Sequence, residues 1–521
     1  MEYIESLKIF GFKKFENFEI NFNKNLNVII GENESGKSTI LEAIDIVLNP
    51  STFKYSDSKM NKYFNIISMK RFFEDKTSLT LPRIEIELFL NLDDIDKAYN
   101  FDGLHFKDSY KDTKTGIRFV YEFDQEFINE VDFTDFADNS VLPLDYYKLS
   151  WMTFQGKAYK RIMLNMNDIF LDNGKVQKDI YGSYSRKIYK AKIDEKSQRK
   201  LSSNFRQSLS KFKKSNDADL MLEAREKIGL DDFKSDFLNL IDIYDGDISL
   251  RNMGSGKENI IKTKLALSNA SFDVVLIDEP ENHLSHTRTR QLISMINEIT
   301  NSQIIIATHS SLIVNRLNLK NLMWIGNSRA HYLNDLSSST SMYFEKLDNF
   351  DILRFILAEK VILVEGAAEY IILPSIIEKI TGKDLDSTNI DVISMGSISY
   401  NKFFEIVKVG NLDKKVLVFR DNDKKDVETN TKVDNLKIYT DPDKNNRTLE
   451  VAFYNLNSKY FDDLYSDRKT ESIYNDKPME KAKAHMLKNK TDNALEIEKG
   501  INDDLLEIPE YLKAGIEWIV K

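Results

Sequence analysis

Two groups of residues in this chain have the types and spacing of phosphate-handling sites. The first is the run Gly31-Glu32-Asn33-Glu34-Ser35-Gly36-Lys37-Ser38, which fits the pattern GxxxxGK[ST]. The second comprises Glu365-Gly366-Ala367-Ala368-Glu369 and Asp421-Asn422-Asp423, two acidic groups more than 300 residues further on. A glycine loop of the first kind holds the phosphates of a nucleoside triphosphate, whereas carboxylates hold divalent cations. A nucleotide-controlled enzyme that acts on nucleic acid is therefore the first hypothesis.

The glycine loop lies between an apolar strand, residues 26–30, and a helix, residues 38–48. In such a loop the backbone N–H groups and the helix N-terminus converge on phosphate oxygens. We expect Lys37 to reach the β- and γ-phosphates and Ser38 to place its hydroxyl on Mg²⁺. The ATP-binding residues predicted in this loop are Gly31, Asn33, Glu34, Ser35, Gly36, Lys37, Ser38 and Thr39.

Two further apolar runs supply partners for the loop. Asp278 and Glu279 end the run that begins at Val274, and this spacing is typical of a Walker B pair. In such a pair Asp278 supports Mg²⁺ and Glu279 activates water. His309 ends the next strand, which begins at Ile304, where it can sense the γ-phosphate. A lone histidine is more often structural, but this position favours a role at the site.

The acidic groups also follow apolar strands. Glu365 comes directly after the run 361–364, and Glu369 returns to the same face one helical turn later. Asp421 and Asp423 end a second apolar run, and their i, i+2 spacing directs both carboxylates to one side. Oxygen ligands without Cys or His suit Mg²⁺ or Mn²⁺. Each acidic motif alone is weak evidence for a metal site. The hypothesis that two ions bind beside a phosphodiester therefore rests on the combination of the motifs.

The order of these patterns predicts more than one domain, as the length of 521 residues also does. We expect an α/β nucleotide-binding domain in two parts, residues 1–94 and 241–345. An insertion without a readable catalytic pattern, residues 95–240, interrupts it. A Ser- and Asn-rich stretch, residues 333–350, then leads to a second α/β domain, residues 346–521.

Two local patterns predict partly exposed elements. Residues 84–92 alternate apolar and acidic side chains, as a half-exposed strand does. Residues 175–214 hold 13 Lys and Arg against three Asp and Glu, although the whole chain has a net charge of −10. This segment either contacts nucleic-acid phosphates or forms a solvated helical arm, which is the favoured interpretation. One buried face of the arm is predicted from apolar residues at helical spacing: Leu201, Phe205, Leu209 and Phe212.

The composition excludes several classes of chemistry. The chain has no cysteine, which excludes disulfides, thiol catalysis and zinc–thiolate sites. No apolar run approaches the roughly 18 residues that cross a bilayer, and the start lacks the regions of a signal peptide. We therefore expect a cytoplasmic protein without a membrane partner.

The run Met253-Gly254-Ser255-Gly256-Lys257-Glu258 makes the pattern more specific. The chain resembles ABC-type ATPases related to RecF, Rad50 and SMC proteins in the order of four motifs. These are the glycine loop, this Ser-Gly signature, the run Asp-Glu-Pro-Glu-Asn-His-Leu-Ser-His from Asp278, and Thr-His at a strand end. In that family the signature of one subunit completes the ATP site of another. The resemblance implies that Ser255 and Gly256 bind ATP across a head-to-tail dimer, with Leu284 and Ser285 at the dimer seam.

The C-terminal half resembles the Toprim fold of topoisomerases, primases and certain nucleases, whose invariant carboxylates match Glu365, Asp421 and Asp423. An ABC-type ATPase followed by a Toprim domain resembles the OLD (overcoming lysogenisation defect) family of ATP-dependent nucleases, which includes Gabija-type antiphage nucleases. The resemblance covers roughly residues 1–90 and 240–521. It implies an α/β fold class: an ABC-type ATPase domain with a helical, dimerisation-like insertion, followed by a Toprim α/β domain.

Two further site residues are assigned through this resemblance alone. Glu450 matches an additional metal-binding glutamate of the family. Lys490 matches a lysine near the scissile phosphate, where it stabilises charge in the transition state. Without the resemblance Lys490 is a solvated lysine in a basic stretch. The implied metal ligands are Glu365, Glu369, Asp421, Asp423 and Glu450.

The leading hypothesis is a metal-dependent DNA endonuclease or nickase that ATP controls, with ATP and Mg²⁺ (Mn²⁺ at the acidic site) as cofactors. The resemblance implies a homodimer or higher oligomer that acts on DNA in antiphage defence, and leaves a helicase-like or other defence partner open. One alternative is an SMC/RecF-like clamp or sensor whose Toprim-like module binds without cutting; another is a topoisomerase. Two questions stay open: whether Glu365 is a metal ligand or a general base, and whether ATP licenses or silences cleavage.

Overall fold

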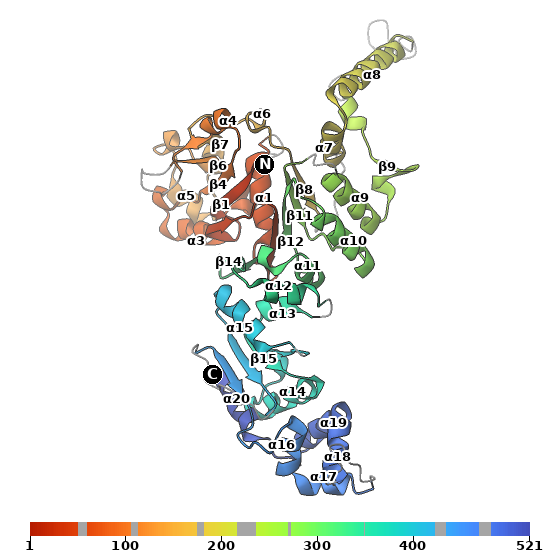
Figure 1. The fold of residues 1–521 in the computed structure, drawn as a ribbon. Helices are drawn as coiled ribbons and strands as arrows, with labels where there is room; N and C mark the ends of the chain where they lie inside the picture. The colour runs from red at the N-terminus through yellow and green to blue at the C-terminus, as the bar shows by residue number, and fades with distance from the viewer. Residues whose placement is uncertain are drawn as a thin grey trace. The chain divides into compact units, whose positions relative to one another are not determined.

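The computed structural model describes residues 1–50, 60–105, 113–173, 182–215, 236–268, 272–347, 350–396, 398–422, 434–467 and 481–521. The chain divides into two compact units, Met1–Asn334 and Asp335–Lys521, each traced in Figure 1. The division falls inside the Ser- and Asn-rich stretch 333–350. Within the described ranges, no helix is long and apolar enough to cross a membrane.

Unit 1 contains an antiparallel sheet with the order β2-β1-β4-β6-β5, in which β7 also pairs with β6. Its strands are β1 (Tyr3–Phe12), β2 (Phe15–Asn21), β4 (Ile84–Asn91), β5 (Asp102–Gly103), β6 (Lys114–Phe123) and β7 (Tyr147–Thr153).

A second, mostly parallel sheet of unit 1 has the order β14-β13-β3-β12-β11-β8, and only β14 is antiparallel. Because parallel strands end at one edge, the motifs that follow β3, β11 and β12 lie along the same edge. The strands are β3 (Leu26–Gly31), β8 (Asp168–Asp172), β11 (Val274–Asp278), β12 (Gln303–Ala307), β13 (Leu322–Gly326) and β14 (Arg329–Tyr332).

The helix α1 (Lys37–Leu48) lies between the two sheets of unit 1 and contacts β4 and β6 on one side and β11 and β12 on the other. Ile40, Leu41, Ile44 and Val47 are therefore all buried. A helix that is apolar all round is expected where both sides are covered. The other helices of unit 1 are α3 (Ile66–Asp75), α4 (Ile95–Tyr99), α5 (Phe133–Asp138), α6 (Arg161–Leu164), α7 (Ser183–Lys192), α8 (Glu195–Ser215), α9 (Ser255–Leu267), α10 (His286–Asn297) and α11 (Ser311–Arg316).

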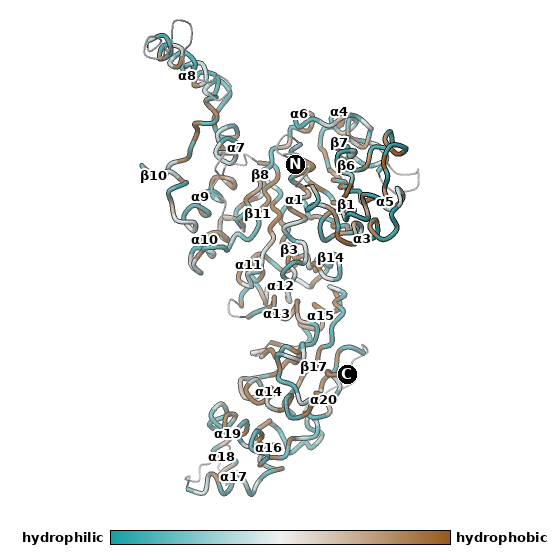
Figure 2. Tube along the Cα trace, turned by 180° about the vertical axis from the view of Figure 1, so that it is seen from behind, coloured by the Kyte–Doolittle hydropathy of each residue, from teal (hydrophilic) through white to brown (hydrophobic). Residues whose placement is uncertain are grey.

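Residues 95–240, the segment in which an insertion is expected, contribute to both sheets. The strands β5, β6 and β7 extend the antiparallel sheet, and β8 forms one edge of the parallel sheet. The helices α7 and α8 supply the helical part, and Figure 2 draws α8 largely in teal. The prediction of a buried face on α8 is wrong for this chain, because Leu201 is 43% and Phe212 54% exposed. Phe205, in the same row, has a ring contact with Phe237, at 5.6 Å between the centroids.

The strand β4 also differs from its prediction, because it is buried on both faces rather than half exposed. Glu85 is only 3% and Glu87 only 2% exposed. Arg118 on the neighbouring strand β6 lies 3.2 Å from Glu85 and 2.7 Å from Glu87, and Arg83 also pairs with Glu85. Burial raises the pKa of Glu85, and the two arginines act against that rise. An acidic face can therefore be buried here because a neighbouring strand supplies its counter-charge.

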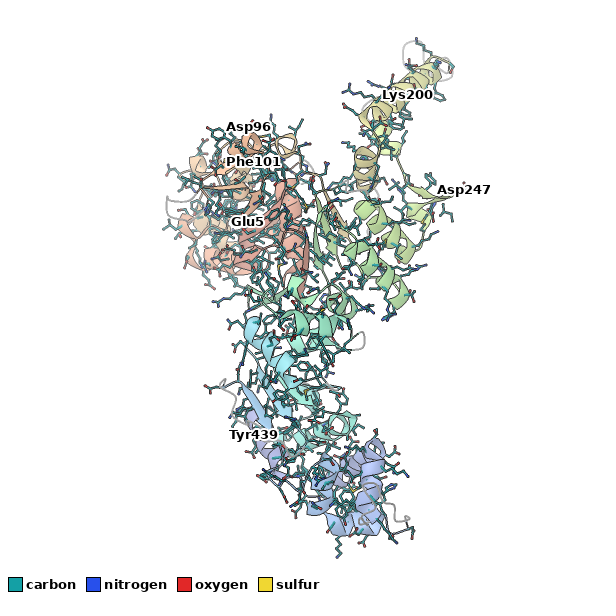
Figure 3. The ribbon with its side chains drawn as sticks, viewed as in Figure 1. Glu5, Asp96, Phe101, Lys200, Asp247 and Tyr439 are labelled. Carbon is teal, nitrogen blue, oxygen red and sulfur yellow. The ribbon has the colours of Figure 1, made fainter. Side chains whose placement is uncertain are left out.

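Unit 2 contains a fully parallel sheet with the order β16-β15-β17-β18. The strands are β15 (Lys360–Val364), β16 (Ile390–Ser394), β17 (Lys415–Phe419) and β18 (Leu436–Tyr439, with Tyr439 labelled in Figure 3). Its helices are α12 (Ser338–Glu345), α13 (Ile352–Leu357), α14 (Ala367–Thr381), α15 (Tyr400–Val409), α16 (Leu449–Leu456), α17 (Ser458–Leu464), α18 (Lys481–Lys488), α19 (Lys490–Asn502) and α20 (Glu510–Val520).

Each unit has its own hydrophobic core. In unit 1 the largest cluster joins α1 to the inner faces of the two sheets. In unit 2 the cluster joins β15 and β17 to α14, α19 and α20. The predicted α/β fold class is confirmed by this layered arrangement in both units.

We expect the Arg118→Met variant to be less stable to unfolding than the parent by about 3 to 5 kcal/mol. The substitution leaves Glu85 and Glu87 buried without their shared counter-charge. Urea denaturation followed by tryptophan fluorescence measures the change, with Trp151 on β7 as a reporter in the same sheet.

Lys148→Met provides a matched control, because Lys148 on β7 pairs with Asp124 at 2.9 Å in an exposed position. An exposed ion pair contributes little to stability, because solvent screens it. Equal destabilisation by the two substitutions would contradict the role assigned to Arg118.

Candidate nucleotide and metal sites

The glycine loop between β3 and α1 has the left-handed backbone that its sequence requires. Glu34 has φ 64° and Gly36 has φ 104°. A Cβ atom on Gly36 would lie 2.4 Å from the ring of Phe15, so only glycine fits there. Ser38, the predicted ligand of Mg²⁺, is exposed at the start of α1.

Lys37 is buried under this loop, and its Nζ donates hydrogen bonds to the carbonyl oxygens of Gly31 and Glu32, both at 2.9 Å. Burial lowers the pKa of Lys37 to about 8, although Glu279 and the other acids at the end of β11 and just beyond it act to raise it. The acidic run that follows β11 is therefore close enough to Lys37 to act on its charge. The structure thus brings the predicted loop and the predicted Walker B pair together.

Glu279 occupies a strained position directly after β11. Its φ is 48°, in the left-handed region that non-glycine residues rarely adopt. The backbone N–H of Glu279 donates to the carbonyl oxygen of Ala307 at the end of β12, at 2.8 Å. Its carboxylate accepts a hydrogen bond from Asn282 and lies 3.3 Å from Nε2 of His309. Glu279 and His309, predicted from separate strand ends, are therefore in contact.

The surroundings of His309 favour the neutral form of its imidazole ring. Burial and the nearby charge of Lys37 lower its pKa, and Glu279 only partly offsets that effect. A neutral ring above the lowered pKa can donate or accept a hydrogen bond without adding a full charge. This property suits a group that senses a phosphate and contacts a water-activating carboxylate.

Glu281 is a site residue for which the motif analysis assigned no role. Its Oε1 accepts hydrogen bonds from Oγ1 of Thr308 at 2.6 Å and from the backbone N–H of His309 at 2.9 Å. Its Oε2 is buried without a hydrogen-bond partner among the described residues. Glu281 thus ties the loop after β11 to the end of β12. In the sequence, the position of Glu281 two residues after Glu279 was the signal that could have indicated this role.

The Ser-Gly signature begins α9. Ser255 is exposed at the first position, and Gly256 is buried behind it. A Cβ atom on Gly256 would lie 2.4 Å from the carbonyl oxygen of His283, so the glycine lets α9 pack against the loop after β11. That loop also carries the predicted seam residues, of which Leu284 is half-buried and Ser285 is exposed.

In unit 2, Glu365 follows β15 and Asp421 lies just beyond β17, the neighbouring parallel strand. The backbone N–H of Asp421 donates to Oε1 of Glu365 at 3.3 Å. The Oδ1 atom of Asp421 in turn accepts from the backbone N–H of Leu449, the first residue of α16, at 3.3 Å. Two carboxylates predicted from separate motifs are therefore side by side.

The remaining two described carboxylates come from helix starts. Glu369, in the first turn of α14, accepts a hydrogen bond from the backbone N–H of Gly366 at 3.1 Å. Burial raises the pKa of Glu369, and Glu450 adds to that rise. Glu450, in the first turn of α16, is only 2% exposed. A carboxylate buried this deeply requires a cation or hydrogen bonds as compensation.

Lys490 supplies one cation to this cluster. It begins α19, and its Nζ lies 3.2 Å from Oε2 of Glu450. Burial acts to lower the pKa of Lys490, but Glu450, Asp421 and Glu369 together raise it above the ordinary value. The side chain is therefore paired with the carboxylates rather than simply solvated.

Asp421 shows how strongly the carboxylates interact. Burial above all, together with the charges of Glu369 and Glu365, raises its pKa to about 7, although Lys490 acts to lower it. Carboxylates that repel one another in this way are stabilised by a divalent cation. However, no three Asp, Glu or His side chains within the described ranges form a cluster that could hold a metal ion. Asp423, the remaining predicted ligand, lies outside the described residues.

Two residues beside this cluster were not predicted to act there. Nε of Arg420 lies 3.6 Å from Oε1 of Glu365. Tyr511, on α20, has a pKa raised well above 10 by burial and by the charges of Asp421 and Glu369. Arg420 immediately precedes Asp421 in the sequence, which was a signal of its position. Tyr511 had no such local signal because α20 comes from the far end of the unit.

Comparison with known families follows the same division. Residues 26–315 match the family described as AAA domain, putative AbiEii toxin, Type IV TA system. Residues 356–423 match the family described as Overcoming lysogenization defect protein-like, TOPRIM domain. The fold and these matches define an ATPase domain followed by a Toprim domain. The chain belongs to the AAA-domain family of the first match, and its two domains together have the OLD-family ATPase–Toprim architecture.

Similar curated proteins match the chain over short segments. RecF from Clostridium kluyveri is 31% identical over 94 residues, which cover 17% of this chain and 24% of that protein. The Rad50 ATPase from Methanopyrus kandleri is 43% identical over 54 residues, which cover 10% and 6% of the two chains. RecF from Lachnospira eligens is 25% identical over 193 residues, which cover 36% and 48%. The chain thus spans less than half the length of each of these relatives.

Two solved structures are similar to this chain with low TM-scores. An SMC head bound to the C-winged helix domain of ScpA has a TM-score of 0.35 and 16% identity, covering 64% of this chain and 97% of that one. ATP-bound RecF of the RecFOR pathway has a TM-score of 0.33 and 14% identity, covering 64% and 99%. The family assignment therefore rests on the two family matches.

We expect Glu279→Gln to slow ATP hydrolysis by about 10²- to 10⁴-fold, the usual contribution of a positioned base. ATP binding should persist, because Lys37 and the glycine loop are unchanged. Phosphate release and equilibrium binding of a fluorescent ATP analogue measure the two properties. Glu298→Gln, at an exposed position near the end of α10, is the control. Unchanged hydrolysis in Glu279→Gln would exclude Glu279 as the base.

The raised pKa of Asp421 predicts a pH-dependent change in stability. Between about pH 4 and its native pKa near 7, the folded state holds a proton that the unfolded state has lost, so Asp421 destabilises the fold increasingly as pH rises. Asp421→Asn should remove this penalty and stabilise unit 2 at pH 8 by on the order of 2 kcal/mol. At pH 4 we expect little change.

Thermal unfolding in EDTA at pH 4, 6 and 8 tests this prediction. Asp413→Asn, which removes an exposed carboxylate of the same unit, is the control and should shift all three melting temperatures equally. A pH-independent effect of Asp421→Asn would contradict the raised pKa.

Proposed function

We propose that this protein is a divalent-metal-dependent DNA endonuclease that cuts one strand and whose activity depends on ATP. The observation that carries the proposal is the carboxylate cluster of unit 2, in which burial and neighbouring carboxylates raise the pKa of Asp421 to about 7. Its position at the carboxyl ends of β15 and β17, within the OLD-like Toprim match, supports the same conclusion. Antiphage defence is part of the proposal because it is the role that the OLD-family resemblance implies.

The residues of unit 2 have distinct roles in this proposal. Glu365, Glu369, Asp421 and Glu450, together with Asp423, would hold Mg²⁺ or Mn²⁺, which supplies an activated water and offsets phosphate charge. Lys490 donates to a non-bridging phosphate oxygen and stabilises the charge that develops there. The side chain of Glu365 is 36% exposed, which also suits a general base that contacts solvent.

In unit 1, the glycine loop would hold ATP: Lys37 would contact the phosphates, and Ser38 and Asp278 would hold Mg²⁺. Glu279 orients the attacking water, and His309 senses the γ-phosphate. The exposed Ser255, with Gly256 beside it, completes the ATP site of a second copy in a homodimer or higher oligomer. This arrangement is supported by the exposure of Ser255 at the start of α9. DNA and a helicase-like or other defence protein are the proposed partners.

A second candidate function is an ATP-driven clamp or sensor whose Toprim module binds nucleic acid without cutting it. One observation favours this candidate: the described residues contain no three-ligand cluster for a metal ion. The two candidates differ in a single measurable property, which is metal-dependent cleavage.

We expect the parent protein to nick supercoiled plasmid in Mg²⁺ or Mn²⁺, and Glu365→Ala and Asp421→Ala to reduce nicking to background. Lys490→Met should slow it by about 10²- to 10³-fold, because a charge-stabilising donor is lost. Glu378→Ala, at an exposed position of α14, is the control. Gel electrophoresis of plasmid forms over time measures the rates.

The same assay can separate activation by ATP from inhibition by ATP. It is run on the parent and Glu279→Gln proteins without nucleotide and with ATP, ADP or a non-hydrolysable analogue. Nicking by Glu365→Ala and Asp421→Ala at the parent rate would contradict the endonuclease. Absence of nicking in every condition would favour the clamp.

A further inference from the structure

A cavity of about 340 Å³ opens beside the carboxylate cluster of unit 2. This volume lies within the range of sites that hold small organic groups. The cavity is lined by Glu365, Met395, Ile398, Ser399, Tyr400 and Arg420. Only Glu365 belongs to the predicted metal ligands, so the other residues have no role in the mechanism proposed above.

Arg420 joins the cavity to the carboxylate cluster. Its Nε lies 3.6 Å from Oε1 of Glu365, and its backbone N–H donates to the carbonyl oxygen of Tyr439 at 3.1 Å. The backbone of Arg420 is therefore fixed between two strand ends. The guanidinium has five N–H donors, and one ion pair with Glu365 leaves donors for a phosphate oxygen.

Tyr400 provides an aromatic wall. Its ring packs edge-on against Phe404, with the ring centroids 5.4 Å apart, and the guanidinium carbon of Arg420 lies 5.8 Å from the Tyr400 ring centroid. The ring is half-buried, whereas Met395 and Ile398 are almost fully buried and form an apolar floor. The cavity thus combines an aromatic ring, apolar side chains and a guanidinium that lies over that ring. This combination matches the two parts of a nucleotide: a flat base and a phosphate.

The start of α15 adds to this match. Tyr400 is the first residue of the helix and Ser399 precedes it, so the N-terminal N–H groups and the positive end of the helix dipole lie at the cavity. Positive potential is needed here, because Glu365 would otherwise repel a phosphate. Arg420 and the helix start together offset that charge.

We infer that this cavity binds an unpaired nucleotide of the DNA strand next to the phosphodiester that is cut, an inference that rests on the proposed endonuclease. Tyr400 stacks on the base and Arg420 binds the adjoining phosphate. The nucleotide is unpaired because a base within a duplex has both faces covered by its neighbours and cannot offer one to Tyr400. The protein therefore prefers single-stranded, gapped or locally opened DNA.

The test measures binding separately from cutting. The full-length protein is titrated, in EDTA, into a fluorescein-labelled 20-nucleotide single strand and into its duplex. We expect the parent to bind the single strand more tightly. Tyr400→Leu should weaken single-strand binding by about tenfold, whereas Tyr400→Phe, which keeps the ring, should stay within about twofold of the parent. Tyr370→Leu, at an exposed position of α14, is the control.

Arg420→Gln should weaken binding and lower the slope of log affinity against log salt by about one, because one phosphate contact is lost. Lys408→Gln removes the same charge from an exposed position of α15 and should leave the slope unchanged. A strand that carries 2-aminopurine reports stacking directly: its fluorescence should fall on binding to the parent and to Tyr400→Phe, but not to Tyr400→Leu. A purely structural role of Tyr400 would not produce this pattern.

Three outcomes separate this inference from the proposed function. Plasmid nicking by the parent, with single-strand binding and quenching unchanged in Tyr400→Leu, overturns the inference and leaves the endonuclease intact. Tyr400-dependent quenching without any nicking supports the cavity as a nucleotide site and overturns the endonuclease. Displacement of the strand by free dAMP at an equal nucleotide concentration also overturns the inference, because the cavity would then be a site for free nucleotides.

Discussion

Both candidate sites depend on one geometric constraint: parallel strands end at a single edge of their sheet. In unit 1 this edge gathers the glycine loop after β3, Glu279 after β11 and His309 after β12, although 278 positions separate Gly31 from His309. In unit 2 the same constraint joins Glu365 after β15 to Asp421 after β17. The helices that begin at these edges, α1 and α14, then add a backbone N–H-rich start to each site.

The two edges differ in their balance of charge, and this difference separates their chemistry. In unit 1 the buried Lys37 faces Asp278, Glu279 and Glu281, so a cation is already present to meet a polyphosphate. In unit 2 three described carboxylates, Glu365, Glu369 and Glu450, raise the pKa of Asp421. Among the described residues, Lys490 pairs with Glu450 and Arg420 with Glu365. Each carboxylate of such a cluster disfavours ionisation of the others, and a bound cation removes this penalty. The site in unit 1 is therefore suited to bind an anion directly, whereas the site in unit 2 is suited to bind an anion through cations held by its carboxylates.

The sequence predicts the parts of this structure that depend on local order. Buried strands such as β3 and β11 and the residues at their ends follow from short apolar runs next to polar motifs. It fails where a distant partner decides the outcome: β4 is buried because Arg118 of β6 compensates Glu85 and Glu87. Glu450 and Lys490 were assigned to the site only through family resemblance, because a polar residue in a helix start carries no local signal. Arg420, which follows β17, and Tyr400, which begins α15, meet only in three dimensions.

The separate hydrophobic cores of the two units have a consequence for the history of the molecule. Among the described residues the two core clusters share no member, so a substitution that loosens one core is not repacked by the other. Each core can then accumulate substitutions independently of the other. Matches to two different families on one chain are what such modular inheritance would leave behind.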